Sequence, residues 1–194
     1  MRSVSGTARG FESPARTQIL TLWAIILMNI RTNKIVTRTL EQRGHDFIKQ
    51  TVTLPTELKK LIDSGFRDEQ DCILLKEFQY FGPGELDSDE KKTEYENFLN
   101  DIHIDDYVLD PSDEFEYLKV GLEFGKRIYE KLKENCRTDF RVTISFSETV
   151  HAGQEIDTYG GCVVKFHKVR PSCDDKFRVE DLDKFVNEGI LVLE

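Results

Sequence analysis

The residue types that could support catalysis in this 194-residue sequence are a few histidines and one run that combines serine, acid and histidine. Hydrolysis needs a nucleophile, a general base and a group that orients the base. Ser147, Glu148 and His151 supply these three types in one short stretch, but closeness in sequence does not establish their geometry. No G-x-S-x-G motif accompanies them. His151 is therefore a candidate base in a loop, and the simpler interpretation is an ordinary polar loop residue.

A second candidate site is the polar face of two predicted strands, 141–147 and 162–169. If the register allows, that face groups Arg141, Thr143, Ser145, Lys165 and His167. Such a cationic, hydrogen-bonding patch suits a phosphate or a carboxylate. The plainer alternative is a solvent-facing strand surface. The possible ligand-binding residues are therefore Arg141, Lys165, His167 and His151.

Metal and cofactor sites are not indicated. His103, Asp105 and Asp106 lie close together, but the glycine and late glutamate of an EF-hand loop are missing, as is any H-E-x-x-H motif. No glycine-rich loop leads into a helix as a phosphate or dinucleotide site requires. The four cysteines, Cys72, Cys136, Cys162 and Cys173, form no C-x-x-C pair and are expected to be reduced thiols in the cytoplasm. We predict no metal site and no cofactor.

Acidic residues are concentrated in residues 85–117. This segment holds thirteen carboxylates and only two lysines, a net charge of −11, whereas the whole chain carries −9, which leaves +2 for the remainder. Charge runs commonly form only a solvated surface. The functional interpretation is a recognition face for a basic protein partner. Concentrated negative charge accelerates association with a positively charged surface and repels the phosphates of nucleic acid. The predicted partner-binding residues are Asp101, Asp105, Asp106, Tyr107 and Asp110.

Aromatic side chains inside the acidic segment could anchor such a contact, since binding energy concentrates in a few buried aromatic residues. Most of them are nevertheless expected to lie in the core of the protein. They are Tyr95, Phe98, Tyr107, Phe115 and Tyr117.

Residues 1–27 differ from the rest of the chain. Arginines, serines and threonines precede an apolar run over 19–30, which at 12 residues is shorter than the roughly 20 that a membrane-spanning helix needs. We interpret 1–27 as an N-terminal extension, which is a targeting segment, an appended stretch or a misassigned start before Met28; a native terminal helix is the remaining alternative. Residues 28–194 are predicted to form one domain without stable membrane insertion.

Hydrophobic periodicity and turn residues predict the elements that position these side chains. The first is a β-hairpin, 34–41 and 46–54, that turns at Gly44. The next elements are a helix over 56–64, a strand over 72–81, a helix over 88–101 and a helix over 113–135. The pattern over 72–81 also fits a helix, but a short aromatic run favours a strand. The last are an antiparallel pair of strands, 141–147 and 162–169, a short helix over 179–187 and a strand over 190–194.

Three patterns specify the packing of these elements. The helix over 88–101 carries an apolar stripe, Tyr95, Phe98, Leu99 and Ile102. The helix over 113–135 holds Gly121 and Gly125 in its interior, where each glycine costs about 1 kcal/mol, so we expect close approach to another backbone. The late strands direct one apolar face to the core, with Val142, Ile144 and Phe146 on one strand and Cys162, Val164 and Phe166 on the other.

Helices interspersed with hairpins predict an α+β fold, in which helices pack on one face of a mostly antiparallel sheet. A small acidic α+β domain without a catalytic signature is similar in type to bacterial immunity proteins that neutralise toxin domains. No motif carries that similarity, so it assigns no residue a role. We therefore expect a non-enzymatic binding protein, of which an immunity-type inhibitor would be one form. The alternative is a small enzyme or ligand-binding domain that uses the 141–169 hairpin or the His151 loop.

Overall fold

The computed structural model describes residues 28–44, 47, 50–80, 82, 84–111, 115–147, 161–173 and 181–194. Residues 1–27 and His151 lie outside the described residues. The described strands are β1 (Ile30–Thr32), β2 (Phe66–Glu69), β3 (Cys72–Leu75), β4 (Ile102–His103), β5 (Phe140–Phe146), β6 (Cys162–Lys168) and β7 (Gly189–Leu193). The described helices are α2 (Lys34–Arg43), α3 (Thr56–Ser64), α4 (Asp89–Leu99) and α5 (Glu116–Asn135), with short 3-10 turns η2 (Ile104–Asp106) and η3 (Leu182–Lys184).

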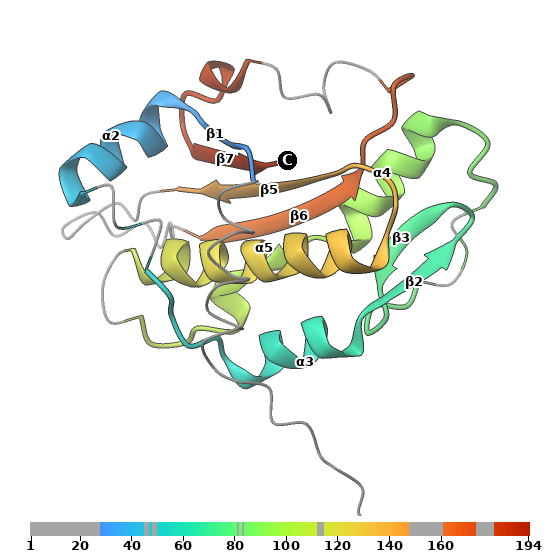
Figure 1. Cartoon of the computed structure of the whole chain (residues 1–194), viewed down its shortest axis with the longest axis horizontal. Coiled ribbons are helices and arrows are strands. Elements are labelled where there is room, and N and C mark those ends of the chain that lie inside the picture. The colour runs from blue at the N-terminus through green and yellow to red at the C-terminus, as the bar shows by residue number, and fades with distance from the viewer. Residues whose placement is uncertain are drawn as a thin grey trace, which may run out of the picture.

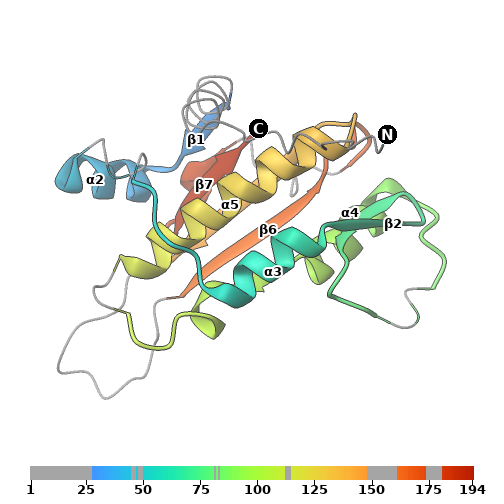
Figure 2. The ribbon, with the colours of Figure 1, turned by 60° about the horizontal axis from the view of Figure 1, so that its bottom comes forward.

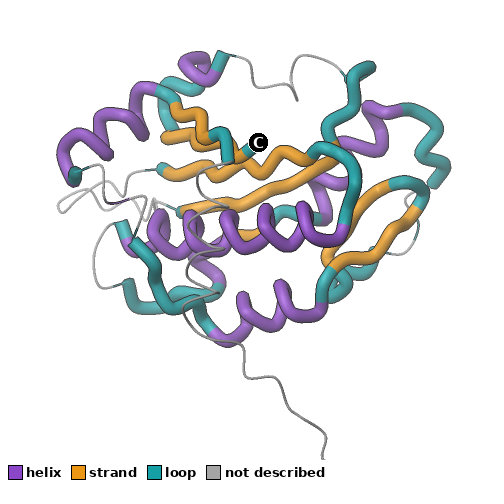
Figure 3. The backbone as a smooth tube through the Cα atoms, in the orientation of Figure 1, coloured by secondary structure: helices purple, strands orange, loops and turns teal. Residues whose placement is uncertain are grey.

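The strands form a five-stranded antiparallel sheet in the order β1-β7-β5-β6-β4 and a separate hairpin of β2 and β3. Helix α5 lies across β5, β6 and β7, and α3 packs on the outside of α5 (Figures 1 and 2). The tube view separates the strand layer from the helices that cover it (Figure 3). The predicted α+β fold is thus confirmed. No helix in the described part of the chain is both long and apolar enough to cross a membrane.

The core lies between α5 and the apolar face of β5 and β6. The predicted face is confirmed, because these inward side chains are all buried: Val142, Ile144, Phe146, Cys162, Val164 and Phe166. Gly121 and Gly125 allow the close approach expected of α5, but to strand side chains rather than to another backbone. A Cβ on Gly121 would lie 2.3 Å from Cys162 Sγ, and one on Gly125 would lie 2.8 Å from Ile144 Cδ1.

The predicted hairpin over 34–41 and 46–54 is wrong. Residues 34–43 form helix α2, whose N-cap Asn33 accepts the Val36 N–H at 3.1 Å, and no described residue of 46–54 is in a strand. Burial explains the error. Val36, Thr39 and Leu40 follow helical spacing and pack inward, and this packing outweighs the weak strand preference of the β-branched residues Val36 and Thr39. Gly44 has the positive φ expected of it, at 89°, but it ends a helix.

Three other predictions need correction. The strand over 72–81 is limited to Cys72–Leu75, and it pairs with β2 through a turn at Gln70 and Asp71, both with positive φ, as in a type I′ hairpin. The helix over 179–187 is reduced, within its described residues, to the single turn η3. Strand β4, in the stretch expected to be only a loop between two helices, was not predicted. Helices α3 and α4 and strand β7 match their predictions.

Candidate functional site

Helix α4 buries polar side chains in addition to most of its expected apolar stripe. Ile102 is buried and Leu99 packs against a buried cluster, so Phe98 is the member of the stripe that departs from the prediction. Thr93 and Glu96 are buried on its inner side, as is Asn100 just beyond its end, whereas the Phe98 side chain is 64% exposed. Tyr95 is buried as expected. Burying a carboxylate without hydrogen-bond or ion-pair partners costs much free energy, so the partners of Glu96 show what the inner side of the helix contacts.

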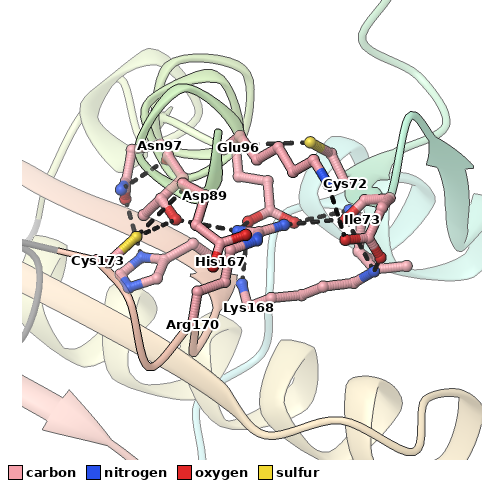
Figure 4. A network of polar contacts seen from close by, with 12 residues as sticks. Cys72, Ile73, Asp89, Glu96, Asn97, His167, Lys168, Arg170 and Cys173 are labelled. Atoms are coloured by element: carbon pink, nitrogen blue, oxygen red, sulfur yellow. Dashed lines mark hydrogen bonds and ion pairs between the residues drawn. The ribbon is translucent and has the colours of Figure 1, made fainter. Parts of the chain in front are cut away.

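Glu96 and Asn100 connect the hairpin to the main sheet, and we call these two residues the polar bridge. Figure 4 shows Glu96 between Ile73 of the hairpin and Lys168 and Arg170 at the end of β6. Glu96 accepts the Ile73 N–H of β3 at 2.8 Å and the Lys168 N–H of β6 at 3.0 Å. Asn100 donates to the carbonyls of Ile73 at 2.9 Å and Phe166 at 3.1 Å. The polar bridge therefore satisfies backbone groups that an additional strand between β3 and β6 would otherwise pair.

Arg170 neutralises the charge of the polar bridge. Its Nη1 donates to Glu96 Oε2 at 2.5 Å and to Thr93 Oγ1 at 3.0 Å, and its Nη2 donates to the Asp71 carbonyl at 2.9 Å. Lys168 Nζ donates to the same carbonyl and to the Asp71 carboxylate. The hydrogen bond from Lys168 holds the pKa of Asp71 below its usual value. These contacts fix the β2–β3 turn to the end of β6.

The four cysteines are all free thiols, as predicted, and Cys162 and Cys173 form no disulfide. Burial raises the pKa of Cys72 to about 12, so it is neither a ready nucleophile nor a ready metal ligand. In the described residues no group of three or more histidine, cysteine or acidic side chains is arranged to hold a metal ion.

His167 is buried beside this network rather than exposed to solvent. Its Nδ1 lies 3.1 Å from Asn97 Oδ1, and Asn97 uses its Nδ2 to donate to the Thr93 carbonyl. The Asn97 amide oxygen therefore accepts a hydrogen bond from His167, and the His167 ring carries its proton on Nδ1. Burial, followed by the nearby Arg141 and Arg170 charges, lowers the pKa of His167 to about 4. The ring is therefore neutral at physiological pH.

This neutral histidine predicts a loss of stability in mild acid. The unfolded chain takes up a proton near pH 6.5 but the folded chain only near pH 4, so stability is full above 6.5 and falls as pH drops between these values. The expected loss is about 3 kcal/mol in total. Urea unfolding between pH 5 and 6.5 should show about 1.5 kcal/mol of this loss, in a range above the titration of most carboxylates. His167→Gln should flatten that slope; an equal slope in the variant would contradict the assignment.

The proposed polar face of β5 and β6 is assembled by the register. Arg141 lies opposite His167, and Thr143 lies opposite Lys165. Both cations contact carboxylates of this chain: Arg141 Nε is 2.6 Å from Glu194 Oε1, and Lys165 Nζ is 2.8 Å from Asp101 Oδ2. A phosphate or carboxylate ligand would compete with these two ion pairs. Ser145 is on the same face, opposite Val163.

The predicted partner-binding acids are not equivalent. Asp106 and Asp110 are exposed, whereas Asp101 is half-buried in its ion pair with Lys165. Asp105, in the turn η2 that follows β4, is half-buried. Its Oδ1 is buried without a hydrogen-bond partner among the described residues, and a Cβ on Gly161 would lie 2.9 Å from it. Tyr107 is half-buried as well. We call residues 85–110 the acidic edge, because they follow the β4 side of the sheet.

An open groove of about 370 Å³ lies on the outer side of α4, and we call it the aromatic groove. The rings of Tyr80 and Phe98 meet edge to face with centroids 5.7 Å apart, and Tyr95 lies 6.4 Å from Tyr80. The Tyr95 hydroxyl donates to Glu69 Oε1 at 3.0 Å, which fixes that ring. The lining residues are Tyr80, Gly82, Leu86, Lys91, Glu94, Tyr95 and Phe98.

A comparison with models of protein families gives a match. A family model, described as the Uncharacterized protein PM0498 family, matches residues 31–194. The chain belongs to this family. No curated protein and no solved structure matches the chain. The PM0498 family description assigns no activity, so a functional argument for this member depends on the geometry of its own residues.

Sequence reasoning missed the aromatic groove in this member of the PM0498 family. Tyr95, Phe115 and Tyr117 are buried as expected for most aromatics of the acidic segment, but Phe98 and Tyr80 are exposed. One signal was present: Phe98 lies four residues after Glu94 and three after Tyr95, so the three share a helix face. That spacing does not say whether this helix face is directed to the core or to solvent. The burial of Glu96 on the inner side of α4 places Phe98 on the solvent side.

Proposed function

We propose that this chain is a non-enzymatic binding protein of the cytoplasm that receives a basic protein partner on its acidic edge. The observation that carries the proposal is the exposed ring pair formed by Phe98 of the acidic helix α4 and Tyr80 of the segment that follows β3. Exposed aromatic side chains that become buried on association are typical anchors of protein interfaces. Here two of them share one open groove with a third ring, that of Tyr95.

The charge of the acidic edge supports a basic partner. Exposed carboxylates lie toward both ends of the edge, at Glu85, Asp87, Glu90, Glu94, Asp106 and Asp110. The two lysines of the edge both contact carboxylates: Lys91 Nζ lies 2.8 Å from Asp87 Oδ1, and Lys92 Nζ lies 3.3 Å from Asp71 Oδ2. The edge therefore keeps a strong negative potential, which attracts a cationic surface and increases the rate of encounter.

An immunity-type inhibitor, which occupies a toxin domain, is the form of this function that agrees with the size and acidity of the chain. The alternative of a small enzyme or ligand-binding domain has less support. Its cations Arg141 and Lys165 face carboxylates of the chain itself, and His167 is buried.

Charge reversal at the far end of the acidic edge tests the proposal. The partner is first identified by pull-down from the native host and mass spectrometry. The double variant Asp106→Lys and Asp110→Lys should then slow association about tenfold or more at low salt, because both carboxylates are exposed and contribute to steering. The difference should shrink as salt is raised, since screening shortens the reach of these charges to about 8 Å at physiological ionic strength.

Glu41→Lys on α2 is the matched control for this experiment, because it reverses an exposed charge outside the acidic edge. It should change the association rate much less. Association that is insensitive both to salt and to the double variant would mean that the carboxylates serve only as a solvated surface.

A further inference from the structure

We infer that the aromatic groove is a receptor for an arginine side chain of the partner, with the guanidinium held against the Phe98 ring and near the Glu94 carboxylate. This inference deepens the proposed function and depends on it for the identity of the macromolecule.

Two aromatic rings, those of Tyr80 and Phe98, line the groove. Tyr80 and Phe98 meet at an interplanar angle of 80°, so they form two walls of a corner instead of a flat stack. A ring face carries negative potential and attracts a cation placed within about 6 Å of its centre. Phe98, at 64% exposed, has ring surface free to be covered, and the hydrogen bond from Tyr95 to Glu69 keeps the third ring in place.

Glu94 and Phe98 are separated by one helical turn on the same face of α4, and both line the groove. A carboxylate offers about four lone-pair sites, so it can accept a guanidinium in addition to other contacts. Lys91, the cation among the described lining residues, forms an ion pair with Asp87, in which its Nζ lies 2.8 Å from Asp87 Oδ1.

The combination favours arginine over lysine or an apolar residue. A guanidinium is planar and weakly hydrated, so it stacks on an aromatic face while its edge donates to a carboxylate. An ammonium is more strongly hydrated and is a point charge. A leucine side chain would gain the ring contact but would leave Glu94 without a charged donor from the partner.

The test uses blocked tripeptides as probes, titrated at millimolar concentration into the full chain while the ring protons of Phe98, Tyr80 and Tyr95 are followed by NMR. The probes are acetyl-Gly-Arg-Gly-amide and its counterparts with citrulline, lysine or leucine in the middle. We expect the arginine probe to shift these rings and to bind about tenfold more tightly than the citrulline and leucine probes. Citrulline keeps the shape of arginine and removes its charge, so this pair isolates the cation.

Two variants assign the contacts. Phe98→Leu keeps the apolar surface but removes the ring, and Glu94→Gln keeps the shape but removes the charge. Each variant should lower the affinity for the arginine probe several-fold. Phe185→Leu, at another partly exposed aromatic residue outside α4, is the matched control and should have no effect. Equal affinity for the leucine or citrulline probe, or no shift of the groove rings by any probe, would overturn the inference.

The two proposals can fail separately. If charge reversal at Asp106 and Asp110 slows partner association but the arginine probe does not bind, the acidic edge is supported and the arginine receptor is rejected. If the arginine probe binds as expected but partner association is unaffected by charge reversal and salt, the acidic edge is rejected as the steering surface.

Discussion

Glu96→Ala is expected to lower the free energy of unfolding by about 3–5 kcal/mol. The substitution leaves the Arg170 guanidinium buried without its carboxylate, and it removes the acceptor from the Ile73 and Lys168 N–H groups. A buried charge that loses its partner accounts for most of this cost. Urea unfolding at neutral pH measures it, and the expected loss is a large share of the 5–15 kcal/mol typical of a folded domain.

Two further variants separate the polar bridge from general effects of mutating α4. Glu90→Ala removes an exposed carboxylate from the first turn of the same helix and should cost less than about 1 kcal/mol. Replacing Glu96 and Arg170 together by methionine should recover much of the loss, because no unpaired charge is then buried. A Glu96→Ala protein that unfolds at the wild-type urea midpoint would show that the bridge contributes little to stability.

Phe166→Ala is expected to cost about 3–5 kcal/mol, and Phe146→Ala about the same. Phe166 is fully buried on β6 and packs edge to face with Phe66 at 5.6 Å, so its loss would open a cavity between the sheet and the hairpin. Phe146 is buried at the end of β5 and lies 5.9 Å from the Phe115 ring. Removing either ring loses both the transfer free energy and the packing around the cavity.

Phe98→Ala is the matched control, because it removes the same side chain from a site that is 64% exposed. Its effect on unfolding should stay within about 0.5 kcal/mol, as for most surface substitutions. The three proteins are compared by urea or thermal unfolding. If Phe98→Ala were as destabilising as Phe166→Ala, the outward orientation of the aromatic groove would be wrong.

The strands of the core could be predicted from sequence because alternation specifies a face. In β5, each second residue from Val142 to Phe146 is apolar and the intervening ones are polar, so one register satisfies both faces. The same reasoning predicted α3, which Gly65 ends with a φ of 76°. These signals act over a few residues and need no distant partner.

The hairpin predicted over 34–54 shows the limit of local preference. The scale of strand propensities spans only about 1 kcal/mol over all residue types, so β-branched residues favour a strand weakly. In α2 that preference is opposed by the Asn33 cap and by burial of Val36 and Leu40 near β7. Contacts with a strand about 150 residues later in the chain are not visible in a short window of sequence.

For the candidate site, the sequence by itself determined the excess of carboxylates in 85–117 and the presence of aromatic residues among them, because charge and residue type are properties of composition. Only the tertiary structure decided which side chains of α4 face outward. Glu96 is buried because Arg170 and two backbone N–H groups, from segments distant in the chain, compensate the loss of its hydration. With Glu96 directed inward, the helical period places Phe98 and Glu94 on the outside, where they line the aromatic groove with Tyr80.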